Sequence, residues 1–258
     1  MALASYGNPN RYISKFREIL RLEDNGGFEI DLDYFAFPFI RNRWISEKFV
    51  ETFGPQVSKG EKLTERHFDI AAALQLRTEE TLFHFSNHLK TSTGSDNLCI
   101  AGGVGLNSVA NGKLVESGLF KDLFMIPSCG DEGTSIGAPL YVYHQTLNRP
   151  NRHLFDNPFL GPEYNRAEIL AALQATDSMI SYEECEDVCQ KAAQSIAGGR
   201  IIGWFQDRME IGPRALGNRS ILVDPRRPEM KDILNLRVKH REPFRPFAPS
   251  ILSEYQKQ

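Results

Sequence analysis

The sequence predicts an α/β protein in which parallel strands alternate with crossover helices. Two successive stretches have the order strand, glycine-containing turn, helix. In the first, a strand at residues 98–101 precedes a helix from Ser108, and in the second, a strand at 123–127 precedes a helix from Thr134. Parallel neighbours need such crossover connections. The 41% hydrophobic and 24% charged residues among 258 are typical of a globular protein with a sizeable core.

The chain before these two stretches predicts two helices and one strand. The first helix, at residues 10–22, has an apolar face made by Ile13, Phe16, Ile19 and Leu20. Residues 28–33 alternate apolar and acidic side chains after a Gly-Gly turn, which is typical of a half-buried strand. Residues 69–90 are rich in alanine and leucine without a helix breaker, and predict one long helix that opens near Thr64.

The chain after these stretches opens with an irregular segment at residues 148–165. It contains three prolines and no periodicity, which predicts either an inter-domain linker or a long surface loop. The remaining segments predict two helices, a strand, a short helix and an extended proline-rich segment, at residues 166–176, 185–199, 200–206, 228–238 and 239–252.

Charge and cysteine usage narrow the class of protein. The net charge of -3 disfavours a nucleic-acid partner, although a local basic pocket remains compatible with it. The four cysteines form no CxxC pair, and Cys185 and Cys189 are spaced by one turn of a predicted helix, which suits reduced thiols. The first residues lack the pattern of a signal peptide, and no apolar run approaches the ~20 residues of a membrane span. We therefore expect a soluble cytoplasmic protein without a membrane partner.

The strongest functional signal is a set of cations on two segments stiffened by glycine and proline. Its six members are Arg208, Arg214, Arg219, Lys239, Arg241 and Arg245. The planar guanidinium group matches phosphate or carboxylate oxygens in a bidentate manner. Glu210 and Glu242 could orient members of this set by ion pairing. The alternative is an internal salt-bridge network, but cations exceed acids here and burial would be costly. An anionic substrate is the better interpretation.

Two glycine-containing turns give weaker signals. Gly102, Gly103 and Gly105 would let a phosphate or nucleoside approach the backbone before a helix N-terminus, and Asn107 could bind a ribose or phosphate oxygen. A tight turn without a ligand explains the same pattern equally well. In the second turn, Asp131 and Glu132 could reach a metal ion or a nucleotide, but by themselves such acids more often stabilise a helix N-terminus.

His84 and His88 are one helical turn apart, as metal ligands can be. However, no glutamate lies between them in the position that a zinc protease uses, and apolar residues surround them. We interpret both as packing or surface histidines.

Several long strings resemble the carbamoyltransferase family that includes the nodulation-factor and antibiotic O-carbamoyltransferases. They are "LCIAGGVGLNSVANGKL", "PSCGDEGTSIGAPL" and above all "GRIIGWFQDRMEIGPRALGNRSILVDPR" and "VKHREPFRPFAPSIL", in which GPRALGNRS and REPFRPFAP are long and specific. With "MALASYGNP" and "LTERHFDIAAALQ", the resemblance covers nearly the whole chain. It implies an enzyme that forms a carbamoyl-adenylate from carbamoyl phosphate and ATP, and passes the carbamoyl group to a hydroxyl of a small molecule.

The resemblance also implies a domain order. Residues 1–147 would be the second lobe of an actin/sugar-kinase/heat-shock ATPase-like domain, with a bound metal that is typically Fe²⁺, and with Mg²⁺ accompanying ATP. Residues 148–165 would be the linker, and residues 166–258 an incomplete YrdC-like α/β domain that activates carbamoyl phosphate.

Roles for individual residues follow from the same resemblance. The nucleotide site would contain Gly102, Gly103 and Asn107. Asp131 would be a metal ligand, which replaces its interpretation as a helix-capping acid. The C-terminal activation region would contain the catalytic residues Arg214, Arg219 and Lys239 and the substrate-binding residues Arg208, Arg241 and Arg245.

The chain also departs from the family. Members are longer and begin with a lobe that carries two metal-ligand histidines, whereas His84 and His88 lie downstream of where those ligands belong. We therefore expect an internal fragment that lacks the N-terminal lobe and the C-terminal end, with its activity by itself left open. The alternatives are a non-catalytic nucleotide-binding remnant, or a relative that carbamoylates tRNA, which the lack of excess basic charge disfavours. A homodimer is left open.

Overall fold

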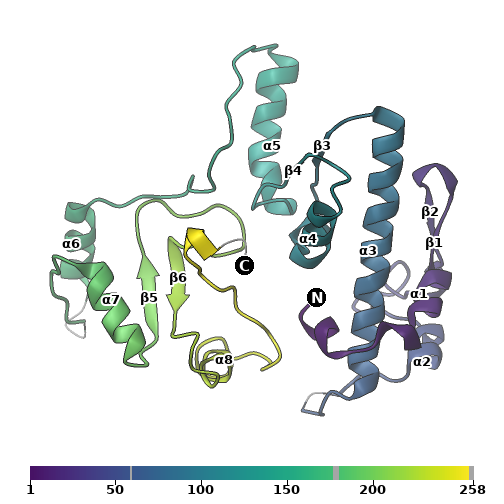
Figure 1. Ribbon diagram of the computed structural model, residues 1–258, viewed down its shortest axis with the longest axis horizontal. Helices are drawn as coiled ribbons and strands as arrows, with labels where there is room; N and C mark the ends of the chain where they lie inside the picture. Colours follow the sequence, from purple (N-terminus) through teal and green to yellow (C-terminus); the bar gives the residue numbers. More distant parts are fainter. Residues whose placement is uncertain (59, 177–179, 256–258) are drawn as a thin grey trace. The chain divides into compact units, whose positions relative to one another are not determined.

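The structure, a computed structural model, describes residues 1–58, 60–176 and 180–255 and divides into two compact units (Figure 1). Unit 1 comprises Met1–Ile100 and Asn107–Phe124, and unit 2 comprises Ala101–Leu106 and Met125–Gln258. Both contain helices and small two-stranded sheets, in agreement with the α/β class. Residues 148–165 form neither helix nor strand, and their role as a domain boundary stays a prediction.

Unit 1 is built on the long helix α3, Glu65–Thr93, which confirms the helix expected near Thr64. A capping box starts the helix, because His67 Nδ1 accepts a hydrogen bond of 2.9 Å from the backbone N–H of Thr64. The helix ends at Gly94, whose φ of 65° is left-handed. None of the described helices, α3 included, combines the length and the apolar composition that crossing a membrane requires.

Two short helices pack on α3 and form the first hydrophobic core of unit 1 (Figure 1). They are α1, Ile13–Ile19, and α2, Glu47–Phe53, of which the sequence analysis finds only the first. The core consists of Ile13, Phe16, Ile19, Tyr34, Phe53 and Ala73. The N-cap of α2 is Ser46, whose Oγ accepts from the backbone N–H of Phe49 at 3.3 Å.

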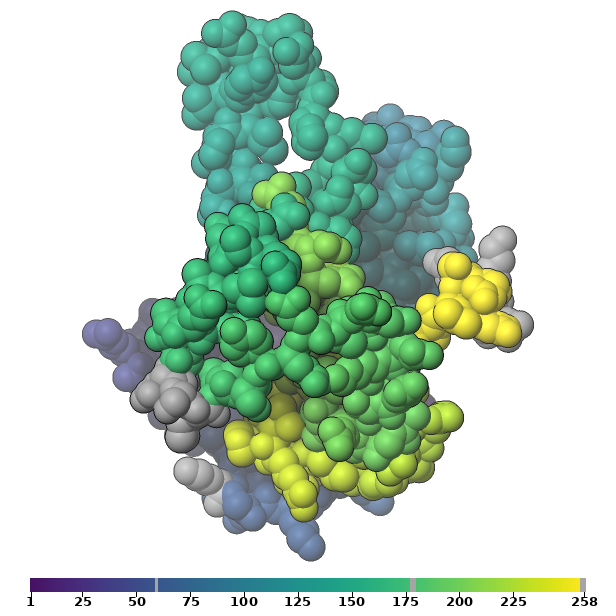
Figure 2. All heavy atoms as spheres, turned by 90° about the vertical axis from the view of Figure 1, so that its left-hand side faces the viewer, coloured from purple at the N-terminus to yellow at the C-terminus, as the bar shows by residue number. Residues whose placement is uncertain are grey.

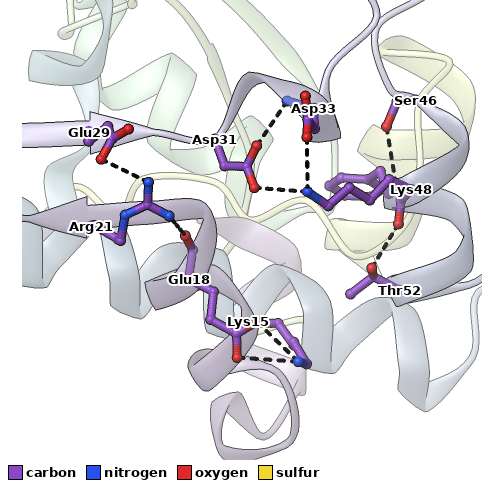
Figure 3. Close-up of polar contacts among 10 residues, drawn as sticks. Lys15, Glu18, Arg21, Glu29, Asp31, Asp33, Ser46, Lys48 and Thr52 are labelled. Atoms are coloured by element: carbon purple, nitrogen blue, oxygen red, sulfur yellow. Dashed lines mark hydrogen bonds and ion pairs between the residues drawn. The ribbon is translucent and has the colours of Figure 1, made fainter.

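A hairpin replaces the end of the predicted first helix. Residues 20–22 are strand β1, Leu20–Leu22, which pairs antiparallel with β2, Phe28–Ile30, so the helix predicted over 10–22 ends at Ile19. The strand expected at 28–33 exists over its first three residues, but its predicted half-burial is wrong, because all three are exposed. The hairpin has only two strands, and its directly paired Arg21 and Glu29 form an ion pair of 2.8 Å (Figure 3).

A lysine of α2 holds the chain that follows this hairpin. Figure 3 shows Lys48 between Asp31 and Asp33, at 2.9 Å and 3.4 Å from their carboxylate oxygens. The hydrogen bond from Lys48, together with that from the backbone N–H of Asp33, lowers the pKa of Asp31. Both aspartates therefore connect the hairpin to α2.

The first predicted order of strand, turn and helix is confirmed, with its strand and helix in unit 1. Strands β3, Asn97–Cys99, and β4, Asp122–Phe124, pair in parallel, and helix α4, Ser108–Glu116, lies between them in the chain. Leu98, Leu114 and Phe120 bury the contact between these elements. The strands are shorter than the predicted 98–101 and 123–127. After β4 the second sequence continues in unit 2 with helix α5, Thr134–Tyr141, which confirms its predicted start.

In its described residues, unit 2 has three further α-helices and one antiparallel strand pair. The helices are α6, Arg166–Ala175, α7, Val188–Ala197, and α8, Met230–Ile233, and the strands are β5, Ile202–Phe205, and β6, Arg219–Leu222. Figure 2 shows a face of this unit on which the green residues around α7 and the yellow-green residues around and after α8 both reach the surface.

The start of α7 corrects the prediction for the cysteine pair. The Asp187 carboxylate accepts from the backbone N–H of Gln190 at 2.8 Å and caps the helix, so the helix begins at Val188. Cys185 therefore lies before the helix and does not share a turn with Cys189. All four cysteines are free thiols.

Burial has a different character in unit 2. Its buried side chains include the polar residues Ser128, Glu210, Asn218, Asp224 and Asn235 beside the apolar Cys129, Met230 and Leu234. Because buried polar groups need hydrogen-bond partners, their contacts decide how the loops of this unit are held.

Candidate functional site

The first arginine segment is a hairpin of unit 2. Strand β5 ends at Phe205, Arg208 follows it, and the loop that carries Arg214 returns the chain to Arg219 at the start of β6. Phe205 and Arg219 are directly paired across the two strands. The hairpin thus places Arg208 and Arg219 at the base of one loop and Arg214 within it.

A buried carboxylate closes this loop. The Glu210 side chain is 0% exposed, and its Oε1 accepts from the backbone N–H groups of Leu216 at 2.7 Å, Asn218 at 2.7 Å and Arg219 at 3.3 Å. Burial opposes ionisation, but backbone N–H donors outweigh it and lower the pKa of Glu210. The loop therefore closes around an internal anion.

The Arg219 side chain completes the closure. Its Nε lies 3.4 Å from Glu210 Oε2, and its Nη2 donates to the carbonyl of Gly212 at 2.5 Å. The side chain is still 34% exposed. The ion pairing of Arg219 with Glu210 confirms the expectation that this glutamate orients a member of the cationic set.

Close backbone approach brings three of the sequence motifs together within unit 2. Gly212 has a φ of +88°, and a Cβ there would overlap the carbonyl of Pro127, so only glycine fits. The GPRALGN loop therefore lies directly on the start of PSCGDEG. The backbone N–H of Gly102 in turn donates to the carbonyl of Cys129 at 2.6 Å, which adds the AGGVG turn.

The segment expected as a linker or long surface loop packs along the arginine hairpin. Arg208 Nε donates to the carbonyl of Gly161 at 3.1 Å. Backbone hydrogen bonds of 2.9 Å join Gly161 N to Met209 O, Met209 N to Pro162 O and Ile211 N to Pro158 O. Arg208 is thus held on this segment by a carbonyl and not by an acid.

The second cationic segment is held by a fully buried amide. Asn235, which is 0% exposed, lies in the helical turn Leu234–Val238 after α8. Its Nδ2 donates to the carbonyls of Arg245 at 3.0 Å and Pro243 at 3.3 Å, and its Oδ1 accepts from Arg241 Nε at 2.8 Å. The Arg241 guanidinium also lies 4.8 Å from the centre of the Phe247 ring.

The six cations fall into three groups by their partners. Arg219 and Arg245 pair with Glu210 and Glu242, the second pair at 2.8 Å, as the sequence analysis anticipates. Arg208 and Arg241 donate to neutral oxygens. Arg214 and Lys239 are exposed and make no side-chain hydrogen bond or ion pair with the described residues. The set is neither a closed salt-bridge network nor wholly unpaired, and the assigned roles stay predictions.

The residues predicted for the nucleotide divide between the units. Gly102 and Gly103 are exposed in unit 2, whereas Asn107 belongs to unit 1. Asn107 caps α4 by accepting from the backbone N–H of Ala110 at 3.2 Å. It also exchanges two hydrogen bonds with the Gln75 amide, of 3.0 Å and 3.2 Å. The side chain of Asn107 is therefore engaged in holding α4 on α3.

Asp131 is exposed in a single helical turn, Asp131–Gly133, that leads into α5. Within the residues that the structure describes, no group of three or more histidine, cysteine, aspartate or glutamate side chains is arranged to hold a metal ion. One carboxylate is fewer ligands than a transition metal takes in proteins. The described donor set therefore does not fit an iron site by itself, and we derive no step through a metal.

His84 and His88 pack on the hairpin turn between β1 and β2. His84 Nε2 lies 3.0 Å from the carbonyl of Gly27, and a Cβ on Gly26 would overlap the His88 ring. These contacts support the packing interpretation of both histidines.

Two buried asparagines that hold the cationic segments escape the sequence analysis. Asn235 lies in the helical pattern "ILNLRV". A polar residue among apolar ones could have indicated a buried side chain that makes several hydrogen bonds. Asn218 is also buried, and its Nδ2 donates to the carbonyl of Arg208 at 2.8 Å while its Oδ1 accepts from Gln206 Nε2 at 3.0 Å. The sequence gives no signal for Asn218, since asparagine is common in loops.

The chain matches known family models in its N-terminal and in its C-terminal part. A family model described as "Carbamoyltransferase N-terminus" matches residues 1–140, and one described as "Carbamoyltransferase C-terminus" matches residues 193–258. The chain belongs to the carbamoyltransferase family. The two matches of this family contain all ten of the predicted site residues, with Gly102, Gly103, Asn107 and Asp131 in the N-terminal match and the six cations in the C-terminal one.

Several known proteins resemble the chain over almost its whole length. Nodulation protein NolO of Bradyrhizobium diazoefficiens is 41% identical over 98% of the chain and 44% of its own length. Nodulation protein NolNO of Sinorhizobium fredii is 40% identical over 98% of the chain and 36% of its own length. An uncharacterised Synechocystis protein is 42% identical over 98% of the chain and 42% of its own length. The chain thus spans less than half the length of these relatives.

Proposed function

We propose that the chain is part of an ATP-dependent O-carbamoyltransferase, which transfers a carbamoyl group from carbamoyl phosphate, through carbamoyl-adenylate, to a hydroxyl of a small molecule. The observation that carries this proposal is the closed arginine loop. A buried anion and a close glycine contact fix the loop, and Arg214 within it has no acidic partner among the described residues. A guanidinium group held in this manner is suited to an anionic ligand.

The charge of the substrates explains why arginines are needed. Carbamoyl phosphate and the ATP triphosphate are both polyanions, so cations must offset their repulsion before they can react. In the activation step, water releases carbamate and inorganic phosphate from carbamoyl phosphate, and a carbamate oxygen then forms a bond to the α-phosphorus of ATP while the bond to pyrophosphate breaks. In the transfer step, the acceptor hydroxyl oxygen forms a bond to the carbamoyl carbon and the bond from that carbon to the AMP oxygen breaks. AMP leaves, and the hydroxyl proton is released. We assign Arg214, Arg219 and Lys239 to charge stabilisation and Arg208, Arg241 and Arg245 to substrate binding.

The proposal extends to the nucleotide and the domain types. We propose that ATP, with Mg²⁺, approaches the backbone at Gly102 and Gly103, where the absence of side chains leaves room. The N-terminal part would belong to an actin-like ATPase domain and the C-terminal part to a YrdC-like domain. A metal such as Fe²⁺ at Asp131 would need further ligands from outside the described residues.

Calorimetry with carbamoyl phosphate tests the proposal on the chain itself. We expect submillimolar binding to the unsubstituted chain, and a loss of about tenfold or more in affinity for Arg214→Ala, because a hydrogen bond to a charged group contributes about 1.5–3 kcal/mol. Arg41→Ala, at an exposed arginine of unit 1, is the matched control and should bind normally.

Two results would contradict the proposal. Absence of carbamoyl phosphate binding to the unsubstituted chain would favour a non-catalytic remnant. An equal loss in Arg214→Ala and Arg41→Ala would show that the arginine loop has no special part in binding.

A further inference from the structure

We propose that Glu210 is a positioning residue, which shapes the loop of residues 211–219 as an internal anion and thereby orients Arg214 and Arg219 for a phosphorylated ligand. The claim that Glu210 shapes the loop concerns this chain alone. The claim that the loop orients Arg214 and Arg219 for a phosphorylated ligand rests on the proposed function. Glu210 itself is fully buried, so it acts through the loop and not by touching the ligand.

The hydrogen-bond directions show what the loop can offer. The backbone N–H groups of Leu216, Asn218 and Arg219 all donate to one oxygen of Glu210. In many phosphate-binding loops, successive backbone N–H groups instead form a concavity for the external anion. Because these three donors are already committed to Glu210, recognition of a ligand falls to the guanidinium side chains.

The second oxygen of Glu210 gives the carboxylate a further role. Oε2 is buried and accepts no hydrogen bond in the described residues, and the nearest ionic partner is Arg219 Nε at 3.4 Å. A charged oxygen is more favourable beside that guanidinium than a neutral one. A glutamine at this position could direct its NH₂ group at Arg219, where two donors would face each other.

The ends of the loop are fixed by other residues. Asn218 is bonded to Arg208 and Gln206, and Gly212 lies against Pro127. Loss of the Glu210 charge should therefore loosen the span between Gly212 and Asn218, which carries Arg214, and leave the remainder of unit 2 folded.

Limited trypsin digestion measures this local order directly. We propose to follow cleavage after Arg214 in Glu210→Gln and Glu210→Ala, with cleavage after Arg41 in unit 1 as the internal reference. When opening is fast, cleavage follows the population of the open form. Hydrogen bonds to a charged group contribute about 1.5–3 kcal/mol, so we expect cleavage after Arg214 to rise about tenfold or more. Glu184→Gln, which removes an exposed charge of the same unit paired with Arg166, is the matched control.

Affinity for carbamoyl phosphate, measured by calorimetry on the same variants, supplies the functional readout. We expect it to fall about tenfold in Glu210→Gln and to stay unchanged in Glu184→Gln. Glu210→Asp keeps the charge but withdraws the carboxylate by one methylene. Its rate of cleavage after Arg214 should therefore lie between those of the unsubstituted protein and Glu210→Gln. This variant replaces Glu210→Gln if the latter fails to fold.

The outcomes separate the two proposals. Unchanged cleavage after Arg214, or an equal rise after Arg214 and Arg41, would overturn the role of Glu210. Suppose that the Glu210 variants are cleaved faster after Arg214 alone, but the unsubstituted protein binds no carbamoyl phosphate. This result would overturn the proposed function and would still support the role of Glu210 in shaping the loop. Faster cleavage with unchanged affinity would overturn the positioning of the arginines.

Discussion

Asp224 shows at the scale of one residue how unit 2 uses buried polar groups. Its side chain is 3% exposed, and its two oxygens accept from Nε and Nη2 of Arg226, both at 2.8 Å. These hydrogen bonds, with that from the backbone N–H of Arg226, lower the carboxyl pKa from 3.8 to about 2. Glu210 and Asn235 have the same character, since each is buried and binds a segment that carries arginine.

The shifted pKa of Asp224 predicts a dependence of stability on pH. Because the unfolded chain takes up this proton more readily than the folded protein, the Asp224 contribution is complete above pH 3.8 and is lost as the pH falls towards 2. We expect Asp224→Asn to lower the free energy of unfolding at neutral pH, and the difference from the unsubstituted protein to narrow over that interval. Urea unfolding at a series of pH values measures it.

Asp232→Asn is the matched control for this experiment, since it changes an exposed aspartate of the same unit. It should leave the free energy of unfolding nearly unchanged at neutral pH. A difference between Asp224→Asn and the unsubstituted protein that is constant over the whole pH range would contradict the assignment to Asp224.

At the scale of elements, the sequence predicts those whose signals are local. Helix α3 follows from composition and its cap, and the β3, α4 and β4 order follows from two glycine turns. Strand β1 is missed because its apolar residues continue the periodicity of α1, and only pairing with β2 distinguishes strand from helix. Helix α2 is missed because it is short and most of its stability comes from packing Phe53 into the core.

The candidate site, like the elements, is predicted from the sequence only in part. Residue types and spacing select the six cations, whose roles stay predictions, and anticipate the ion pairs of Glu210 with Arg219 and of Glu242 with Arg245. They do not show which cations are paired, because the partners of Arg208 and Arg241 are a distant carbonyl and a buried amide. Nor do they show that Asn107 pairs with Gln75, 32 residues away in the sequence.

Two glycines in unit 1 give a matched prediction at this scale. Gly94 ends α3 with a φ of 65°, and Gly112 lies inside α4 without positive φ, and in both cases a Cβ would meet open space. We expect Gly94→Ala to lower the free energy of unfolding by about 1 kcal/mol, because alanine is strained in the left-handed region. We expect Gly112→Ala to raise it by about 0.5–1 kcal/mol through helix propensity.

Thermal or urea unfolding of both variants provides the measurement. Each glycine is the control for the other, since the added methyl group is the same and only the backbone conformation differs. Changes of the same sign in the two variants would contradict the assignment of these effects to backbone conformation.

At the scale of the whole molecule, the two units differ in what stabilises them. Unit 1 has two apolar clusters, around Phe53 and Leu114, beside carboxylates of lowered pKa at Asp31, Glu80 and Asp96. In unit 2, the carboxylates of lowered pKa include Glu210 and Asp224, which are themselves among its buried side chains. Stability that depends on ionised carboxylates is lost in acid, and burial of apolar surface is not.

We therefore expect unit 2 to lose its structure at a higher pH than unit 1 during acid titration. The chain has two tryptophans, Trp44 in unit 1 and Trp204 in unit 2, so Trp44→Phe leaves one fluorescent reporter of unit 2. Far-UV circular dichroism, to which the long helix α3 contributes strongly, reports mainly on unit 1. Coincident transitions by the two probes would contradict this expectation.

The assignment of residues 101–106 to unit 2 has a consequence for dissecting the protein. The backbone passes from one unit to the other after Ile100, after Leu106 and after Phe124. No single cleavage of the peptide chain can therefore yield two complete halves. A gene truncated after codon 124 would encode unit 1 together with residues 101–106, which belong to unit 2. The remaining chain, from Met125, would lack those six residues and with them the AGGVG turn.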